Sequence, residues 1–77
     1  MKVTATRTTQ RDIDSTNITV KIEKDGLGYN ASGHINNRTN FVHLSADEEI
    51  DEVGMEEAEI DLDEIGIQIE DREIELN

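Results

Sequence analysis

The chain has 77 residues, a formal net charge of −12 at pH 7 and no cysteine. This length predicts one small domain over residues 1–77, and the lack of cysteine excludes disulfides, thiolate catalysis and cysteine-ligated zinc. The first residues carry no apolar signal segment, and no apolar run approaches the roughly 20 residues that cross a bilayer, so we expect a cytoplasmic protein without membrane contact.

The N-terminal third of the chain predicts two strands separated by a polar loop. Val3–Thr8 is rich in threonine and alternates weakly, whereas Gln10–Asn17 is polar and predicts the loop. Over Asn17–Glu23, three β-branched residues face one way and polar residues face the other. That alternation is typical of a strand with one buried face.

The next segment predicts a hairpin and a further strand. Asp25-Gly26 lies between alternating runs, and both residues tolerate positive φ, which favours a two-residue turn. Tyr29–Ile35 is then the returning strand, and Phe41–Leu44 is the next short strand of the meander. Residues 1–44 are therefore expected to form a near-neutral antiparallel meander of three or four strands.

A short acidic helix is predicted to follow the meander. Ser45 with Glu48 three residues later matches a capping box, in which two otherwise unpaired amides find partners. Gly54 is placed to end this helix, although an extension to Ala58 is compatible with the sequence. Whether residues 56–65 are helix or strand stays open at this point.

From Glu59 onwards the apolar residues alternate with polar ones, as in Ile60 to Leu62 and again in Ile65 to Ile69. This spacing predicts one or two acidic strands, over Glu57–Asp63 and Glu70–Glu75. The fold class is thus expected to be α+β, with the helix packed on one face of a small antiparallel sheet. The expected core consists of Ile18, Val20, Ile22, Tyr29, Ile35, Phe41, Ile50, Val53, Ile60, Leu62, Ile67 and Ile69.

The charge is distributed unevenly between the two parts of the chain. Residues 1–44 carry six bases and four acids, whereas residues 45–77 carry fifteen acids and one base. Such an asymmetry indicates either a solvating acidic segment or a surface directed at a partner. Ordered isoleucines within the acidic part favour a folded surface. The candidate partner-binding residues are Asp47, Glu48, Glu49, Asp51, Glu52, Glu56, Glu57, Glu59, Asp61 and Asp63.

The predicted spacing of these carboxylates approaches that of nucleic-acid phosphates. Five acids within residues 47–52 of a helix would give one charge per about 1.8 Å, against about 1.7 Å along duplex DNA. In strands, Glu59, Asp61 and Asp63 would share one face at a spacing of roughly 6.7 Å. In charge and size the chain resembles the small acidic inhibitors that phages use against restriction, repair and CRISPR nucleases, although it shares no residue motif with them.

The resemblance implies a non-catalytic inhibitor that mimics phosphates and occupies the basic groove of a nucleic-acid-binding protein. The alternative is a structural, assembly or homo-oligomeric protein that dimerises through exposed strands and uses its acids for solubility. Direct binding of nucleic acid is disfavoured by the charge of −12. No cofactor is expected.

Metal binding and catalysis have weak support in the sequence. Asp61–Gly66 matches the start of an EF-hand loop, but Arg72 occupies the place of the required bidentate glutamate. His34 and His43 lie on neighbouring predicted strands without a nucleophile or a third ligand. We therefore expect neither a metal site nor an enzyme.

Overall fold

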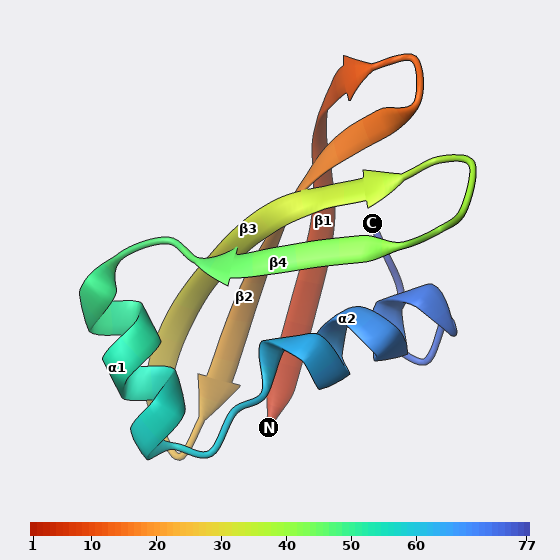
Figure 1. Cartoon of the computed structure of the whole chain (residues 1–77). Helices are drawn as coiled ribbons and strands as arrows, with labels where there is room; N and C mark the ends of the chain where they lie inside the picture. The colour runs from red at the N-terminus through yellow and green to blue at the C-terminus, as the bar shows by residue number, and fades with distance from the viewer.

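A computed structural model describes residues 1–9 and 13–77, with residues 10–12 placed only as part of a strand. Four strands come first in the chain and two helices follow, so the α+β prediction is confirmed (Figure 1). Both helices pack on the same face of the sheet. The elements are β1 Lys2–Asp12, β2 Ser15–Lys24, β3 Leu27–Asn36, β4 Val42–Ala46, α1 Glu49–Glu57 and α2 Leu62–Glu70.

The four strands form an antiparallel meander in the order β1-β2-β3-β4, as the sequence predicted. Asp25 and Gly26 both have positive φ, of 53° and 80°, and join β2 to β3 in the expected two-residue hairpin. The predicted loop over Gln10–Asn17 is wrong at both ends, because β1 continues to Asp12 and β2 begins at Ser15. β4 begins at Val42, one residue after the predicted start at Phe41, and continues to Ala46.

The acidic strands predicted after Glu57 do not form, since a second helix occupies most of this region. Ile65 and Ile69 are 1% and 5% exposed, whereas Ile67 is 54% exposed. A spacing of four residues fits both a helix and a strand, and the exposed residue between them shows that the helical period applies. The Asp61 carboxylate accepts a hydrogen bond from the Asp63 N–H at 2.9 Å and so caps α2.

The boundaries of α1 also differ from the prediction. Ser45 lies in β4 opposite Ser32, so the capping box does not form, and Glu48 occupies the N-cap position without a side-chain hydrogen bond. Gly54 lies inside the helix, where a Cβ atom would come within 2.6 Å of the Tyr29 ring. The longer helix that the sequence allowed is therefore the observed one, and the glycine serves close packing.

Each helix ends in a Schellman motif built on a residue other than glycine. Glu59 has φ 58° after α1, and Arg72 has φ 62° after α2. In both motifs the residue after the left-handed one donates its N–H to a carbonyl in the last turn of the helix. Ile60 donates to the Met55 carbonyl and Glu73 donates to the Gln68 carbonyl, each at 2.8 Å. These two left-handed residues turn the chain sharply and hold it against the sheet.

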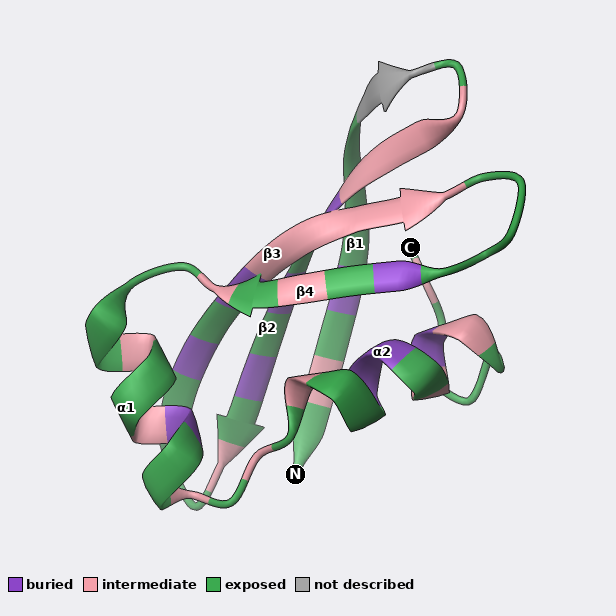
Figure 2. Cartoon of the chain, in the orientation of Figure 1, coloured by how far each residue is buried: buried purple, intermediate pink, exposed green. Residues whose placement is uncertain are grey.

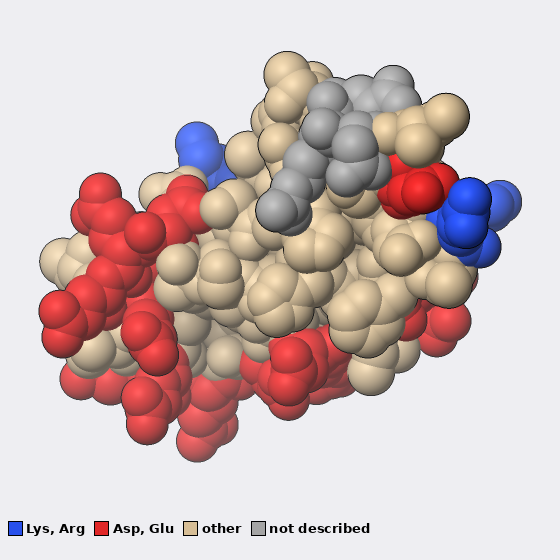
Figure 3. Space-filling model, turned by 45° about the horizontal axis from the view of Figure 1, so that its top comes forward, with Lys and Arg blue, Asp and Glu red and all other residues tan. Residues whose placement is uncertain are grey.

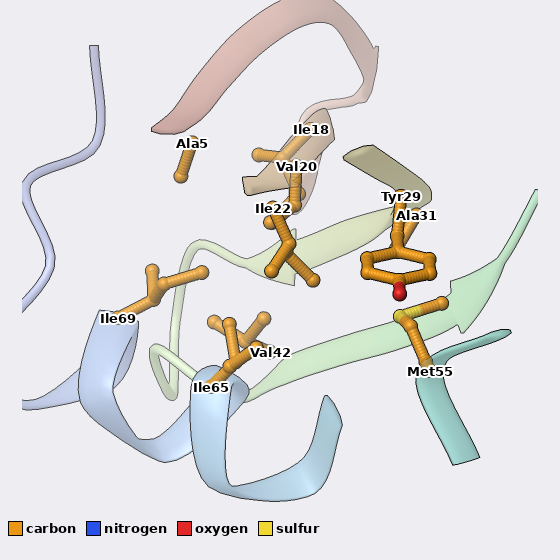
Figure 4. Close-up of a cluster of buried hydrophobic side chains, with 10 residues drawn as sticks. All are labelled: Ala5, Ile18, Val20, Ile22, Tyr29, Ala31, Val42, Met55, Ile65 and Ile69. Carbon is orange, nitrogen blue, oxygen red and sulfur yellow. The ribbon is translucent and has the colours of Figure 1, made fainter. Parts of the chain in front are cut away.

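The core lies between the sheet and the two helices (Figures 2 and 4). Five predicted core residues are buried, and three more are partly buried against them. The prediction is wrong for four residues that are largely exposed, namely Phe41, Ile50, Val53 and Ile67. Among the residues whose burial the structure describes, five buried ones were not predicted, namely Ala5, Ala31, Val42, Met55 and Ile65.

The C-terminal residues add a short parallel bridge to the outer edge of β1. The Asn77 N–H donates to the Ala5 carbonyl at 2.9 Å, and the Arg7 N–H donates to the Asn77 carbonyl at 2.8 Å. The predicted strand over Glu70–Glu75 is therefore wrong, since pairing begins only at Leu76. This bridge covers part of an edge that would otherwise be open to another strand.

Candidate partner-binding surface

The ten predicted acids come together around the first helix and the turn that follows it. We call these ten residues the acidic surface. Asp47 and Glu48 precede α1, five acids belong to the helix, Glu59 and Asp61 lie in the α1–α2 turn, and Asp63 is in α2. Nine are exposed and Asp51 is half-buried. In Figure 3 red side chains crowd the end of the molecule formed by α1 and continue along the lower edge of the view.

The predicted spacing of the carboxylates is corrected by the structure. Asp47 and Glu48 are not helical, so the even helical row of five charges does not exist. Glu59, Asp61 and Asp63 do not share a strand face, because they lie in a left-handed turn, at an N-cap and in a helix. The surface is therefore a curved cluster of charges rather than two regular rows.

Three acids of this surface also hold the fold together. The Asp47 carboxylate accepts a hydrogen bond from the Ser32 hydroxyl at 2.6 Å, and the Asp51 carboxylate accepts one from the Asn30 N–H at 3.0 Å. Both contacts attach the start of α1 to β3, while Asp61 caps α2. Hydrogen bonds to ionised acceptors are worth about 1.5–3 kcal/mol, so variants at these three positions would test folding as well as binding.

No carboxylate of the acidic surface is paired with a base in the part of the chain that the structure describes. The ion pair found there joins Arg38 to Asp14 at 2.9 Å, far along the chain from these acids. Lys24 approaches the end of α1, but its ammonium group donates to the backbone carbonyl of Ala58. Within residues 1–9 and 13–77, the negative charge around α1 is therefore offset by no direct ion pair.

The outer side of α1 also exposes apolar side chains among its acids. Ile50 is 76% exposed and Val53 is 48% exposed. The sheet-facing side of the helix instead carries Asp51, Gly54 and Met55. This inversion explains why the apolar pattern misled the core prediction, and it leaves a mixed apolar and acidic surface exposed.

A groove lies on the inner side of the acidic surface, where β4, α1 and the α1–α2 turn meet. Its volume is about 580 Å³. Buried Met55 and half-buried Ala46, Ile60 and Leu62 contribute its apolar part. Met55 was not among the predicted residues, although it follows Asp51 by four residues and so shares its helix face. Glu52, Glu56, Glu59 and Asp61 contribute the acidic part.

The opposite face of the sheet carries no helix and is mostly neutral and polar. Thr4, Thr6 and Thr19 are exposed there. His34 lies directly opposite His43 with ring centroids 5.7 Å apart, so the prediction that they lie on neighbouring strands is confirmed. Among the described residues, no group of three or more histidine, aspartate or glutamate side chains is arranged to hold a metal ion.

The comparisons with protein-family models, with curated proteins and with solved structures find no match to this chain. Among the described residues, neither helix is long and apolar enough to span a membrane.

Proposed function

We propose that this protein is a non-catalytic inhibitor whose acidic surface occupies a basic, nucleic-acid-binding groove on an intracellular partner. The observation that supports the proposal most strongly is the unpaired charge. Fifteen acids lie in residues 45–77, and no carboxylate there is within 4.0 Å of a basic nitrogen in the described residues. Their mutual repulsion destabilises the compact state, and a basic partner would relieve it.

The exposed apolar residues on α1 support a protein partner over a merely solubilising role. A face that serves solubility needs charge alone, whereas Ile50 and Val53 add apolar area that water does not favour. Protein interfaces combine such apolar anchors with a polar rim. On α1 the neighbouring Glu49, Glu52 and Glu57 would supply that rim.

The mechanism is competition between carboxylates and phosphates for the same lysine and arginine side chains. A groove that binds nucleic acid owes much of its affinity to phosphate contacts, and this affinity falls steeply with salt. An acidic protein in that groove excludes the nucleic acid both by charge and by volume. Its own affinity is expected to fall with salt in the same way.

To test the proposal, the immobilised chain captures proteins from a host-cell lysate at low salt, and duplex DNA is then used to elute them. Proteins held by the immobilised chain are released with DNA, identified, purified and titrated with the wild-type chain and with two variants that carry the same change in net charge. The face variant replaces Glu48, Glu49, Glu56 and Glu57 with Gln. The control variant replaces Glu23, Glu64, Glu73 and Glu75 with Gln.

The face variant is expected to bind the identified partner at least tenfold more weakly than the control variant, because its substitutions lie on the proposed contact surface. Both variants are expected to keep the fold, because all eight side chains are exposed. Circular dichroism checks this expectation. Equal affinities for the two variants, or a partner that DNA does not release, would contradict the proposed function.

Self-association is the second candidate function, and the uncovered face of the sheet is the observation that favours it. Sizing at low and high salt separates the two functions. A dimer formed through strands or through the neutral face persists in salt, because its contacts are not ionic. A mimic that is monomeric under both conditions and binds a basic partner supports the first proposal.

A further inference from the structure

The groove beside the acidic surface has the shape and chemistry of a site for a long basic side chain. It lies between the C-terminal end of β4, the inner side of α1 and the α1–α2 turn. Its lining is apolar at Met55, Ile60 and Leu62 and acidic at Glu56 and Glu59. Lysine and arginine have the same division, with an apolar stem and a charged head, and they commonly bury the stem while the head stays in water.

We propose that this groove binds a lysine or arginine side chain from an extended basic segment of the partner. The proposal rests on the proposed function and specifies how the partner would be gripped. The carboxylates of the lining give charge complementarity with such a segment and disfavour an acidic or purely apolar one. The ammonium group of Lys24 donates to the Ala58 carbonyl and forms no ion pair with these carboxylates in the described residues.

The outer edge of β4 near Ala46 supports an extended segment rather than a helix. The Val42 N–H points away from β3 and donates to the Glu70 carboxylate at 2.8 Å. Because N–H direction alternates along a strand, Leu44 and Ala46 also point their backbone groups away from β3. Ala46 lines the groove. An extended segment can therefore pair with the backbone near Ala46 while it places one side chain in the groove.

The turn that borders the groove is held in place before any partner arrives. Glu59 adopts φ 58°, and the Ile60 N–H donates to the Met55 carbonyl at 2.8 Å. Asp61 is fixed by its hydrogen bond to the Asp63 N–H. These contacts order both ends of the turn, so binding needs little further ordering of the chain.

The test uses a fluorescently labelled six-residue peptide that alternates valine and arginine, titrated into the 77-residue chain at low salt. One control peptide carries citrulline, which is neutral and nearly isosteric, in place of arginine. A second control peptide carries backbone N-methyl groups on its valines. We expect each change to weaken binding at least tenfold. The amide NMR signals of Ala46, Met55 and Ile60 are expected to shift most when the arginine peptide binds.

Two protein variants with the same change in net charge separate the groove from the overall charge. The groove pair replaces Glu56 and Glu59 with Gln, and the matched pair replaces Glu64 and Glu73 with Gln. The groove pair is expected to weaken peptide binding at least tenfold, and the matched pair less than threefold. Equal weakening by the two pairs, or NMR shifts centred away from Ala46, overturns the groove proposal.

The outcomes for the groove and for the proposed function can be distinguished. If the two pairs weaken the peptide equally while DNA still releases the partner, the groove proposal fails and phosphate mimicry stands. If the groove pair alone weakens the peptide but nucleic acid does not compete with the partner, the groove binds basic segments and the mimicry fails. An arginine peptide that does not bind the wild-type chain at low salt also overturns the groove proposal.

Discussion

Replacing Ile65 or Ile67 with alanine distinguishes the observed helix from the predicted strand in the acidic part of the chain. The Ile65 side chain is 1% exposed, whereas the Ile67 side chain is 54% exposed. Truncating a buried isoleucine to alanine costs about 2–5 kcal/mol, through lost burial and the cavity that remains. At Ile67 the side chain is half in water, and alanine favours the helix by a few tenths of a kcal/mol, so we expect a cost below about 1 kcal/mol.

The difference between these two variants is large against the total stability. A domain of 77 residues has a free energy of unfolding of about 4–12 kcal/mol. Urea unfolding followed by circular dichroism is therefore expected to show a much lower midpoint for Ile65→Ala and an almost unchanged one for Ile67→Ala. In a strand the two side chains would share one face. Equal losses would refute the helical assignment and the packing of α2 on the sheet.

Three further predictions follow from the packing, the backbone and the charge. Gly54→Ala is expected to lower the free energy of unfolding by about 1 kcal/mol, because overpacking against the buried Tyr29 ring exceeds the gain in helix propensity. Unfolding is followed by the fluorescence of this tyrosine, and a more stable variant would contradict the close packing. Arg72→Gly is expected to raise the free energy of unfolding by roughly 0.5–1 kcal/mol, because glycine adopts the left-handed conformation with φ 62° without the steric cost of a Cβ atom. A variant that is less stable in urea unfolding would contradict this account. Raising the NaCl concentration from 0.01 M to 1 M shortens the Debye length from about 30 Å to about 3 Å. The midpoint of urea unfolding is therefore expected to rise, because salt screens the repulsion between the unpaired acids. An unchanged midpoint would argue against strong self-repulsion.

The sheet was predictable because its signals are local and consistent. Alternation over β2 and the Asp25-Gly26 turn fix one hairpin, and the observed register follows from the two-residue turn. Ile18 and Ile22 were predicted as core and are buried. In this part of the chain the propensity, the turn chemistry and the burial agree.

The helical part was harder to predict because its local signals conflict. Ile65, Ile67 and Ile69 alternate as in a strand, yet two of them also have the helical spacing of four. In α1 the apolar side chains of Ile50 and Val53 face solvent while Gly54 meets the sheet, so the expected buried stripe is reversed. This packing depends on tertiary contact with Tyr29, which no local pattern reveals.

The candidate surface was predicted in its composition but not in its geometry. All ten acids lie around α1 and the following turn, because charge segregation along the chain is visible in the sequence. The groove was not predicted, since it depends on Glu59 adopting a left-handed conformation and on Met55 turning inward. Glutamate at a helix C-terminus gives no local signal for this conformation.

Competition with DNA on the identified partner tests the central claim most directly. Labelled duplex DNA is bound to that partner, the wild-type chain is added, and fluorescence anisotropy follows the bound DNA at several salt concentrations. We expect full displacement by the wild-type chain and at least tenfold weaker displacement by the face variant, with an effect that decreases as salt rises. A ternary complex in which the DNA stays bound, or equal displacement by the face and control variants, would contradict the account.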